Sequence, residues 1–218
     1  MLSMKQLALS LVSRHLPAFA VIATLSGCAS HLAQVPPRID LARYEPVGLV
    51  AFSADPAKTT LGQQATQQFA DALLASQSGF ELLELGPADS AVARLLAQGD
   101  APAAAQEIGR QKQLTAVFFG QLITAGPTPS GHVSDGGSLS VTGTVSAELN
   151  VRLLSASTGG TLWRSSGTAS QSVGNVSMSG GRLPSISAAD PNAAYSKLVN
   201  DLVGQVTTDF RPTWVKQK

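Results

Sequence analysis

Residues 139–153 read LSVTGTVSAELNVRL, and every odd-numbered position of this run carries an apolar residue or a glycine. The even-numbered positions carry Ser, Thr, Glu, Asn and Arg. Such strict alternation predicts one long β-strand with an apolar face and a polar face. Ser157-Thr-Gly-Gly160 follows and predicts a tight turn into a second strand, Thr161–Ser165. The two strands are therefore expected to form an antiparallel hairpin.

The half of the chain before this hairpin alternates between strand-like and helix-like patterns. A Thr-x-x-Gln capping box at Thr60 predicts where the first helix begins, and Asp100 is the expected N-cap of the third. Strands that alternate with helices imply right-handed crossovers and a partly parallel sheet. The predicted strands are residues 47–52, 80–85 and 115–122, and the predicted helices begin at Thr60, near Pro87 and at Asp100.

The part after the hairpin ends in a predicted helix, from Asp190-Pro191 to near Phe210, with one broad apolar stripe. Trp163 and Trp214 are expected to be packing anchors. Residues 126–138 and 171–189 are rich in Gly, Ser and Pro and are predicted to be aqueous loops. The fold class expected is α/β (α+β): a single mixed sheet with helices packed on it, βαβαα crossovers, then a long antiparallel hairpin and a C-terminal helix.

The N-terminus has the features of a lipoprotein signal peptide. Lys5 and Arg14 flank a short apolar stretch, and the main apolar run, Leu16–Ala23, is well short of the ~20 residues that span a bilayer. Leu25-Ser-Gly-Cys28 matches a lipobox and contains the only cysteine. We therefore predict cleavage between Gly27 and Cys28 and attachment of acyl chains, such as palmitate, to Cys28. The alternative is an ordinary N-terminal helix with a free cysteine.

The predicted division of the chain follows from that cleavage. Residues 1–27 are the signal peptide, 28–45 a lipidated tether with Pro36-Pro37, 46–210 the folded domain, and 211–218 a C-terminal tail. Ala29 and Ser30 follow the cysteine, with no Asp to retain a lipoprotein at the inner membrane, which implies the periplasmic face of the outer membrane. Removing residues 1–27 also removes two basic residues and lowers the formal charge of +1 by two units. No basic field remains to attract nucleic acid.

Few residues are available for catalysis. His132 is the one histidine within the predicted domain, and it has neither a cysteine nor a second histidine nearby for a metal site. Ser134 and Asp135 lie close to it in one predicted loop. A Ser-His-Asp triad needs a nucleophile, a base and an orienting carboxylate that are held in separate orientations, which neighbours in one loop do not supply. We expect no catalytic residues, no cofactor and no metal, and hence no enzyme.

Five stretches together resemble the curli-secretion lipoprotein family (CsgG-like). They are the strand Val47–Phe52, the helix around Ala70–Leu74, the strand after a Gly-Phe turn at Gly79–Leu85, the segment Ala104–Gly120, and the hairpin Val151–Trp163 with its Thr-Gly-Gly turn. The penicillin-binding-protein activators of the LpoB type and the N-terminal domain of TolB share this fold. The chain departs from the family pattern at Ser155 and Ala156, where an acidic residue is usual. The resemblance covers roughly residues 45–210 and implies a fold rather than one role.

Two non-enzymatic functions follow. The favoured one is an outer-membrane-anchored periplasmic lipoprotein that binds other envelope proteins in an assembly; the partners are the membrane, through Cys28, and envelope proteins that the sequence does not name. The alternative is a subunit of a CsgG-like secretion channel, for which the long alternating strand supplies a candidate membrane hairpin. Residues 124–146 and 165–185 contain no Trp, Tyr or Phe, so the aromatic girdle expected at membrane interfaces is missing. The sequence leaves open whether copies form a homo-oligomer.

Overall fold

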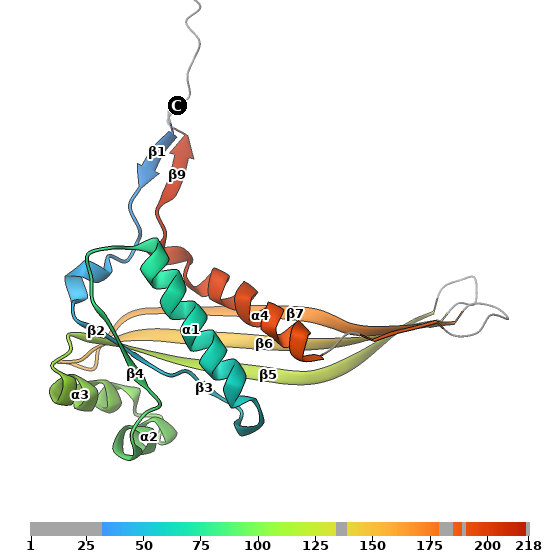
Figure 1. The fold of residues 1–218 in the computed structure, drawn as a ribbon, viewed down its shortest axis with the longest axis horizontal. Helices are drawn as coiled ribbons and strands as arrows, with labels where there is room; N and C mark the ends of the chain where they lie inside the picture. Colours follow the sequence, from blue (N-terminus) through green and yellow to red (C-terminus); the bar gives the residue numbers. More distant parts are fainter. Residues whose placement is uncertain (1–31, 134–138, 179–184, 189–190, 217–218) are drawn as a thin grey trace, which may run out of the picture.

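The computed structural model describes residues 32–133, 139–178, 185–188 and 191–216 (Figure 1). Gly27 and Cys28 lie outside the described residues. The elements, in chain order, are β1 (Leu32–Val35), η1 (Leu41–Tyr44), β2 (Val47–Val50), β3 (Ser53–Ala54), η2 (Pro56–Lys58), α1 (Thr59–Ser76), β4 (Leu82–Gly86), α2 (Ser90–Ala97), α3 (Ala101–Lys112), β5 (Ala116–Val133), β6 (Leu139–Ser155), β7 (Thr161–Met178), β8 (Ser185–Ala188), α4 (Pro191–Val206), η3 (Thr208–Phe210) and β9 (Thr213–Lys216).

One mixed sheet organises these elements, which confirms the predicted α+β class. Its strand order is β4-β2-β5-β6-β7-β8, and β3 pairs with β5 off this path. β2 runs parallel to both β4 and β5, whereas the pairs β5–β6, β6–β7 and β7–β8 are antiparallel. α1 and α4 pack side by side on one face of the sheet, and α2 and α3 cover one end of the other face (Figure 1).

The two faces of the sheet have separate hydrophobic cores. Under α1 and α4, four aromatic rings meet: Phe118 lies 5.2 Å from Phe69, 6.1 Å from Trp163 and 5.9 Å from Phe210 between ring centroids. On the other face, Phe119 packs with residues of α2 and α3. Adjacent strand residues point to opposite faces, so Phe118 and Phe119 each support one core, and both are buried as the apolar run at 115–122 predicts.

The first three helices begin close to where the sequence predicts, at Thr59, Ser90 and Ala101. Asp100 accepts a hydrogen bond from the Ala103 amide at 3.0 Å, which confirms the predicted cap of α3. Asp89 caps α2 in the same way. The capping box at Thr60 is wrong, because the N-cap residue of α1 is Lys58, which makes no side-chain cap hydrogen bond. Asp55 instead caps the preceding turn, η2, which leads directly into α1.

The predicted loops at 126–138 and 171–189 are wrong for most of their length. Residues 126–133 belong to β5, residues 171–178 to β7 and residues 185–188 to β8; the rest lie outside the described residues. Proline normally interrupts a strand ladder, but beyond Leu122 the one described strand that pairs with β5 is β6. Edge strands and bulges are the places in a sheet that tolerate proline: Pro129 lies in the edge part of β5, and Pro127 lies at the register irregularity between Ala125 and Thr128.

The expected tether and tail also contain regular structure. β1 and β9 pair antiparallel with the register Gln34 to Trp214, and so join the two ends of the chain into a two-stranded stalk (Figure 1). After the stalk, η1 places Leu41 fully inside the first core. Regular structure is therefore present before residue 46, within the segment predicted to be a tether. The pairing joins segments from opposite ends of the sequence, which local patterns cannot reveal.

Candidate functional site

The most prominent surface feature is the far end of the sheet, where β5, β6, β7 and β8 continue beyond α1 and α4 (Figure 1). We call residues 128–133, 139–144, 174–178 and 185–188 the distal ribbon. The register is continuous across it: Gly131 pairs with Val141, Val141 with Val176, and Val176 with Ile186. Near the start of α4, the Tyr195 hydroxyl donates a hydrogen bond to the Ala125 carbonyl at 2.9 Å and fixes the helix on β5 just before the distal ribbon.

The distal ribbon has two unlike faces. Alternate strand positions share a face, so Pro129, Gly131, Val141 and Gly143 lie on the face that α4 covers nearer the body. Their neighbours Thr128, Ser130, Thr142 and Thr144 lie on the other face. At these eight positions β5 and β6 are thus apolar or glycine on one side and hydroxyl-bearing on the other.

The stalk is the second exposed feature. Three of the large hydrophobic residues that the structure leaves exposed belong to it: Val35 is 39% exposed, Trp214 61% and Val215 47%. Trp214 is therefore not the packing anchor that the sequence predicts. Trp163 is one, because it is 7% exposed and its indole Nε1 donates a hydrogen bond to Asp209 Oδ2 at 3.0 Å. An isolated two-stranded ribbon is marginally stable in water, so an apolar surface beside the stalk would stabilise it.

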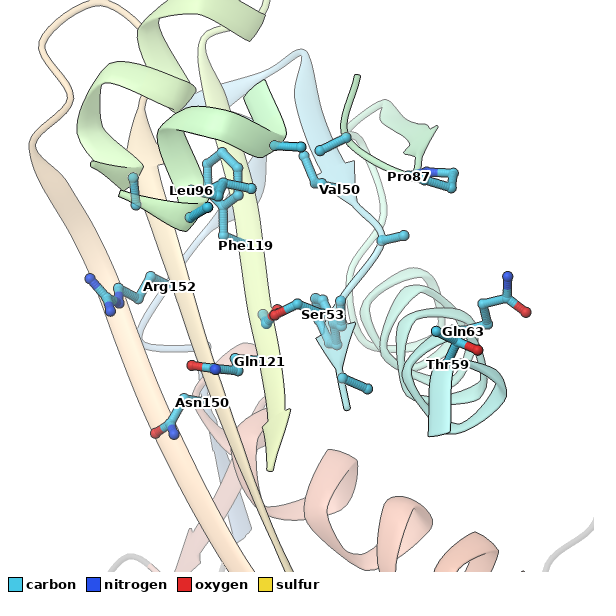
Figure 2. A pocket seen from close by; sticks show the side chains of 18 of the residues that line it. Val50, Ser53, Thr59, Gln63, Pro87, Leu96, Phe119, Gln121, Asn150 and Arg152 are labelled. Atoms are coloured by element: carbon cyan, nitrogen blue, oxygen red, sulfur yellow. The ribbon is translucent and has the colours of Figure 1, made fainter. Parts of the chain in front are cut away.

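The third feature is a cavity of about 760 Å³ at the ends of β2 and β4. Val50, Leu96 and Phe119 supply apolar lining, and Gln121, Asn150 and Arg152 supply polar groups. Figure 2 shows the side chains of these three polar residues pointing to the same side of β5 and β6. No motif in the sequence indicates this cavity, because its lining comes from β2, β3, β5, β6, α1, α2 and α3.

Of the residues weighed for catalysis, the structure describes only His132. His132 lies in β5 of the distal ribbon, in register with Ser140, and Ser134 and Asp135 lie outside the described residues. Within the described part of the chain, no three His, Cys, Asp or Glu side chains gather as metal ligands do. No helix among the described residues is long and apolar enough to cross a membrane.

Comparison with known proteins leaves the family open. No protein-family model matches the chain, and no curated protein does. Among solved structures, a PelC dodecamer from Paraburkholderia phytofirmans is 15% identical, with 84% of this chain and 97% of that chain covered and a TM-score of 0.43. A putative neuraminyllactose-binding hemagglutinin homolog from Helicobacter pylori is 11% identical (73% and 79% covered, TM-score 0.43). A lipoprotein from Neisseria meningitidis is 17% identical (58% and 82% covered, TM-score 0.32). These values are too low to assign this chain to any of their families.

Proposed function

We propose that this chain is a non-enzymatic, lipid-anchored module of the bacterial cell envelope, held at the periplasmic face of the outer membrane through Cys28, that binds other envelope proteins in an assembly. The observation that carries the proposal is the distal ribbon: four strands project from the body with both faces free of the helices (Figure 1). A projecting sheet of this kind offers a large contact surface, and binding costs little conformational entropy because the backbone is already ordered by its hydrogen bonds.

The stalk supports the anchor. Only residues 29–31 separate Cys28 from Leu32, where β1 begins, so the lipidated cysteine lies within about 14 Å of the stalk even when that segment is fully extended. The stalk would then meet the membrane surface, where Trp is enriched because its ring is apolar and its N–H is polar. The exposed Trp214 and Val215 suit that position.

The direction of the ribbon favours protein binding over membrane insertion. In Figure 1 the stalk and the strands of the distal ribbon leave the body in different directions. If residues 29–31 hold the stalk at the membrane, the distal ribbon does not run beside the stalk and does not point toward the bilayer. Pro127 and Pro129 also reduce the number of donors along the outer edge of β5, which limits uncontrolled pairing with other strands.

A subunit of a CsgG-like secretion channel is the second candidate, favoured by one observation. The apolar and hydroxyl-bearing faces of the distal ribbon are the pattern that a strand needs when one side contacts lipid and the other contacts water. The channel would require several copies whose ribbons pair edge to edge, and the outer edge of β5 beyond Leu122 is free for such pairing among the described strands.

Site-specific photo-crosslinking in cells separates the candidates. A benzophenone amino acid replaces Ser130 or Thr142 in the distal ribbon, and Gln111, which is exposed on α3, serves as the matched control. The proposal predicts adducts with other envelope proteins from both ribbon positions and none from Gln111. Adducts only with further copies of the chain would favour the channel, and adducts confined to lipid or absent at both ribbon positions would contradict the proposal.

A further inference from the structure

The cavity lies where open α/β sheets bind their ligands. The chain leaves β2 through α1 to reach β4 on one side, and then returns through α2 and α3 to β5 on the other side of β2. α1 and α3 cover opposite faces of the sheet, so the strand order reverses between β2 and β5. A crevice forms at such a reversal, outside the carboxyl ends of the parallel strands. Val50 at the end of β2 and Phe119 in β5 both line the cavity.

The size and lining of the cavity suit a small organic ligand. Its volume of about 760 Å³ falls within the usual range for ligand sites, roughly 300–1,000 Å³. Val50, Leu96 and Phe119 form an apolar part, and Val50 and Phe119 are buried members of the second core, so this wall is rigid. The amides of Gln121 and Asn150 supply hydrogen-bonding groups beside it.

The charge beside the cavity is positive. Arg152 lines the cavity, and its register partner on β7 is Arg164. Both are exposed, and neither takes part in an ion pair with any of the described residues. Like charges directly opposite each other destabilise an antiparallel pair of strands, and an anion placed between them would remove that repulsion.

The surrounding groups do not neutralise this pair. Glu148 is the acidic residue on the same face of β6, and it accepts a hydrogen bond from Asn150 Nδ2 at 2.9 Å. It is four residues from Arg152, about 13 Å along the strand. On this face of β6 the positive charge of Arg152 therefore lies beside the cavity, and the negative charge of Glu148 lies farther along the strand.

We propose that the cavity binds a small amphipathic anion, with its apolar part against Val50, Leu96 and Phe119 and its anionic oxygens on the Arg152 guanidinium, next to Arg164. The planar fork of an arginine pairs two oxygens of a carboxylate or phosphate at once. This site is separate from the distal ribbon and from the anchor, and it does not depend on the proposed function.

Protection of an introduced thiol tests the site on the full-length lipoprotein in lipid nanodiscs. Ala97 is exposed on α2 and lines the cavity, so Ala97→Cys places a reactive thiol at its mouth; Ala93→Cys is the second position. The wild-type chain measures any labelling at Cys28. The rate of maleimide labelling is followed with 2-naphthoate, 2-naphthyl phosphate or neutral 2-naphthol. The first two probes distinguish a carboxylate from a phosphate ligand.

We expect at least one anionic probe to slow labelling at a concentration about tenfold lower than 2-naphthol, because charge-assisted hydrogen bonds to arginine are roughly twice as strong as neutral ones. Arg152→Gln should remove that preference. Arg94→Gln, which changes an exposed arginine of α2 outside the cavity lining, should leave it intact. Equal protection by all three probes, protection unchanged by Arg152→Gln, or no protection at either cysteine position would overturn the proposal.

Discussion

At the residue scale, Asp209 connects three distant parts of the chain. Its Oδ2 accepts the hydrogen bond from Trp163 of β7, and its Oδ1 accepts one from Arg38 Nη1 at 3.2 Å. The two hydrogen bonds differ in how much they stabilise the folded protein. The Trp163 side chain is 7% exposed, so water replaces a lost partner of its N–H less readily, whereas the Arg38 side chain is 82% exposed and water competes for its guanidinium.

We predict that Asp209→Ala lowers the free energy of unfolding by about 1–3 kcal/mol, the cost of leaving a buried donor unpaired. Arg38→Ala is the control, because it removes only the exposed ion pair and should cost less than about 1 kcal/mol. Urea titration followed by circular dichroism measures both variants. Equal losses for the two would show that the indole hydrogen bond contributes nothing of its own.

At the scale of the elements, two helical glycines have opposite roles. Gly109 of α3 faces the hairpin turn, and a Cβ at this position would collide with the Ala156 methyl and lie 3.1 Å from Ala156 Cα. Gly204 of α4 has nothing within 4 Å of the same ideal Cβ. The first glycine permits the close approach of α3 and β6, while the second only weakens its helix.

Gly109→Ala should therefore destabilise the protein by about 1–2 kcal/mol, because overpacking outweighs the gain in helix propensity. Gly204→Ala should stabilise it by about 0.5–1 kcal/mol. Thermal unfolding of both variants is the measurement. A stable Gly109→Ala variant would mean that α3 does not contact the turn as closely as the structure shows.

The sequence predicts most of these elements, because their signals are local. The alternation of residues 139–153 predicts β6, and Asp100 predicts the start of α3. That alternation also predicts the β6 part of the distal ribbon, but the β5 part escapes prediction because Pro127 and Pro129 normally exclude a strand, which an edge strand tolerates. The β7 and β8 parts escape because residues 171–189 are rich in Gly and Ser. The stalk and the cavity escaped for a related reason: both bring together residues from distant segments, and the sequence has no local sign of that pairing.

At the scale of the whole molecule, the proposed function requires a lipid on Cys28. We predict that Cys28→Ser leaves an uncleaved precursor that retains residues 1–27, because lipid transfer to the cysteine precedes cleavage. Ser30→Ala, two residues downstream, should be processed normally. Mass spectrometry of the mature protein measures both, and a mature chain with an unmodified Cys28 would contradict the anchor.

The proposed function requires that the distal ribbon of the anchored protein lies in water, where proteins can bind both of its faces. The most direct test is labelling by a membrane-impermeant maleimide of the lipidated protein on vesicles, with Ser130→Cys on the hydroxyl-bearing face and Gly131→Cys on the other. We predict rates within about threefold of each other, since adjacent strand positions on opposite faces both meet water. A Gly131→Cys variant that labels more than about tenfold more slowly until detergent is added, while Ser130→Cys reacts freely, would contradict the claim, because hydrocarbon excludes water and with it the reagent.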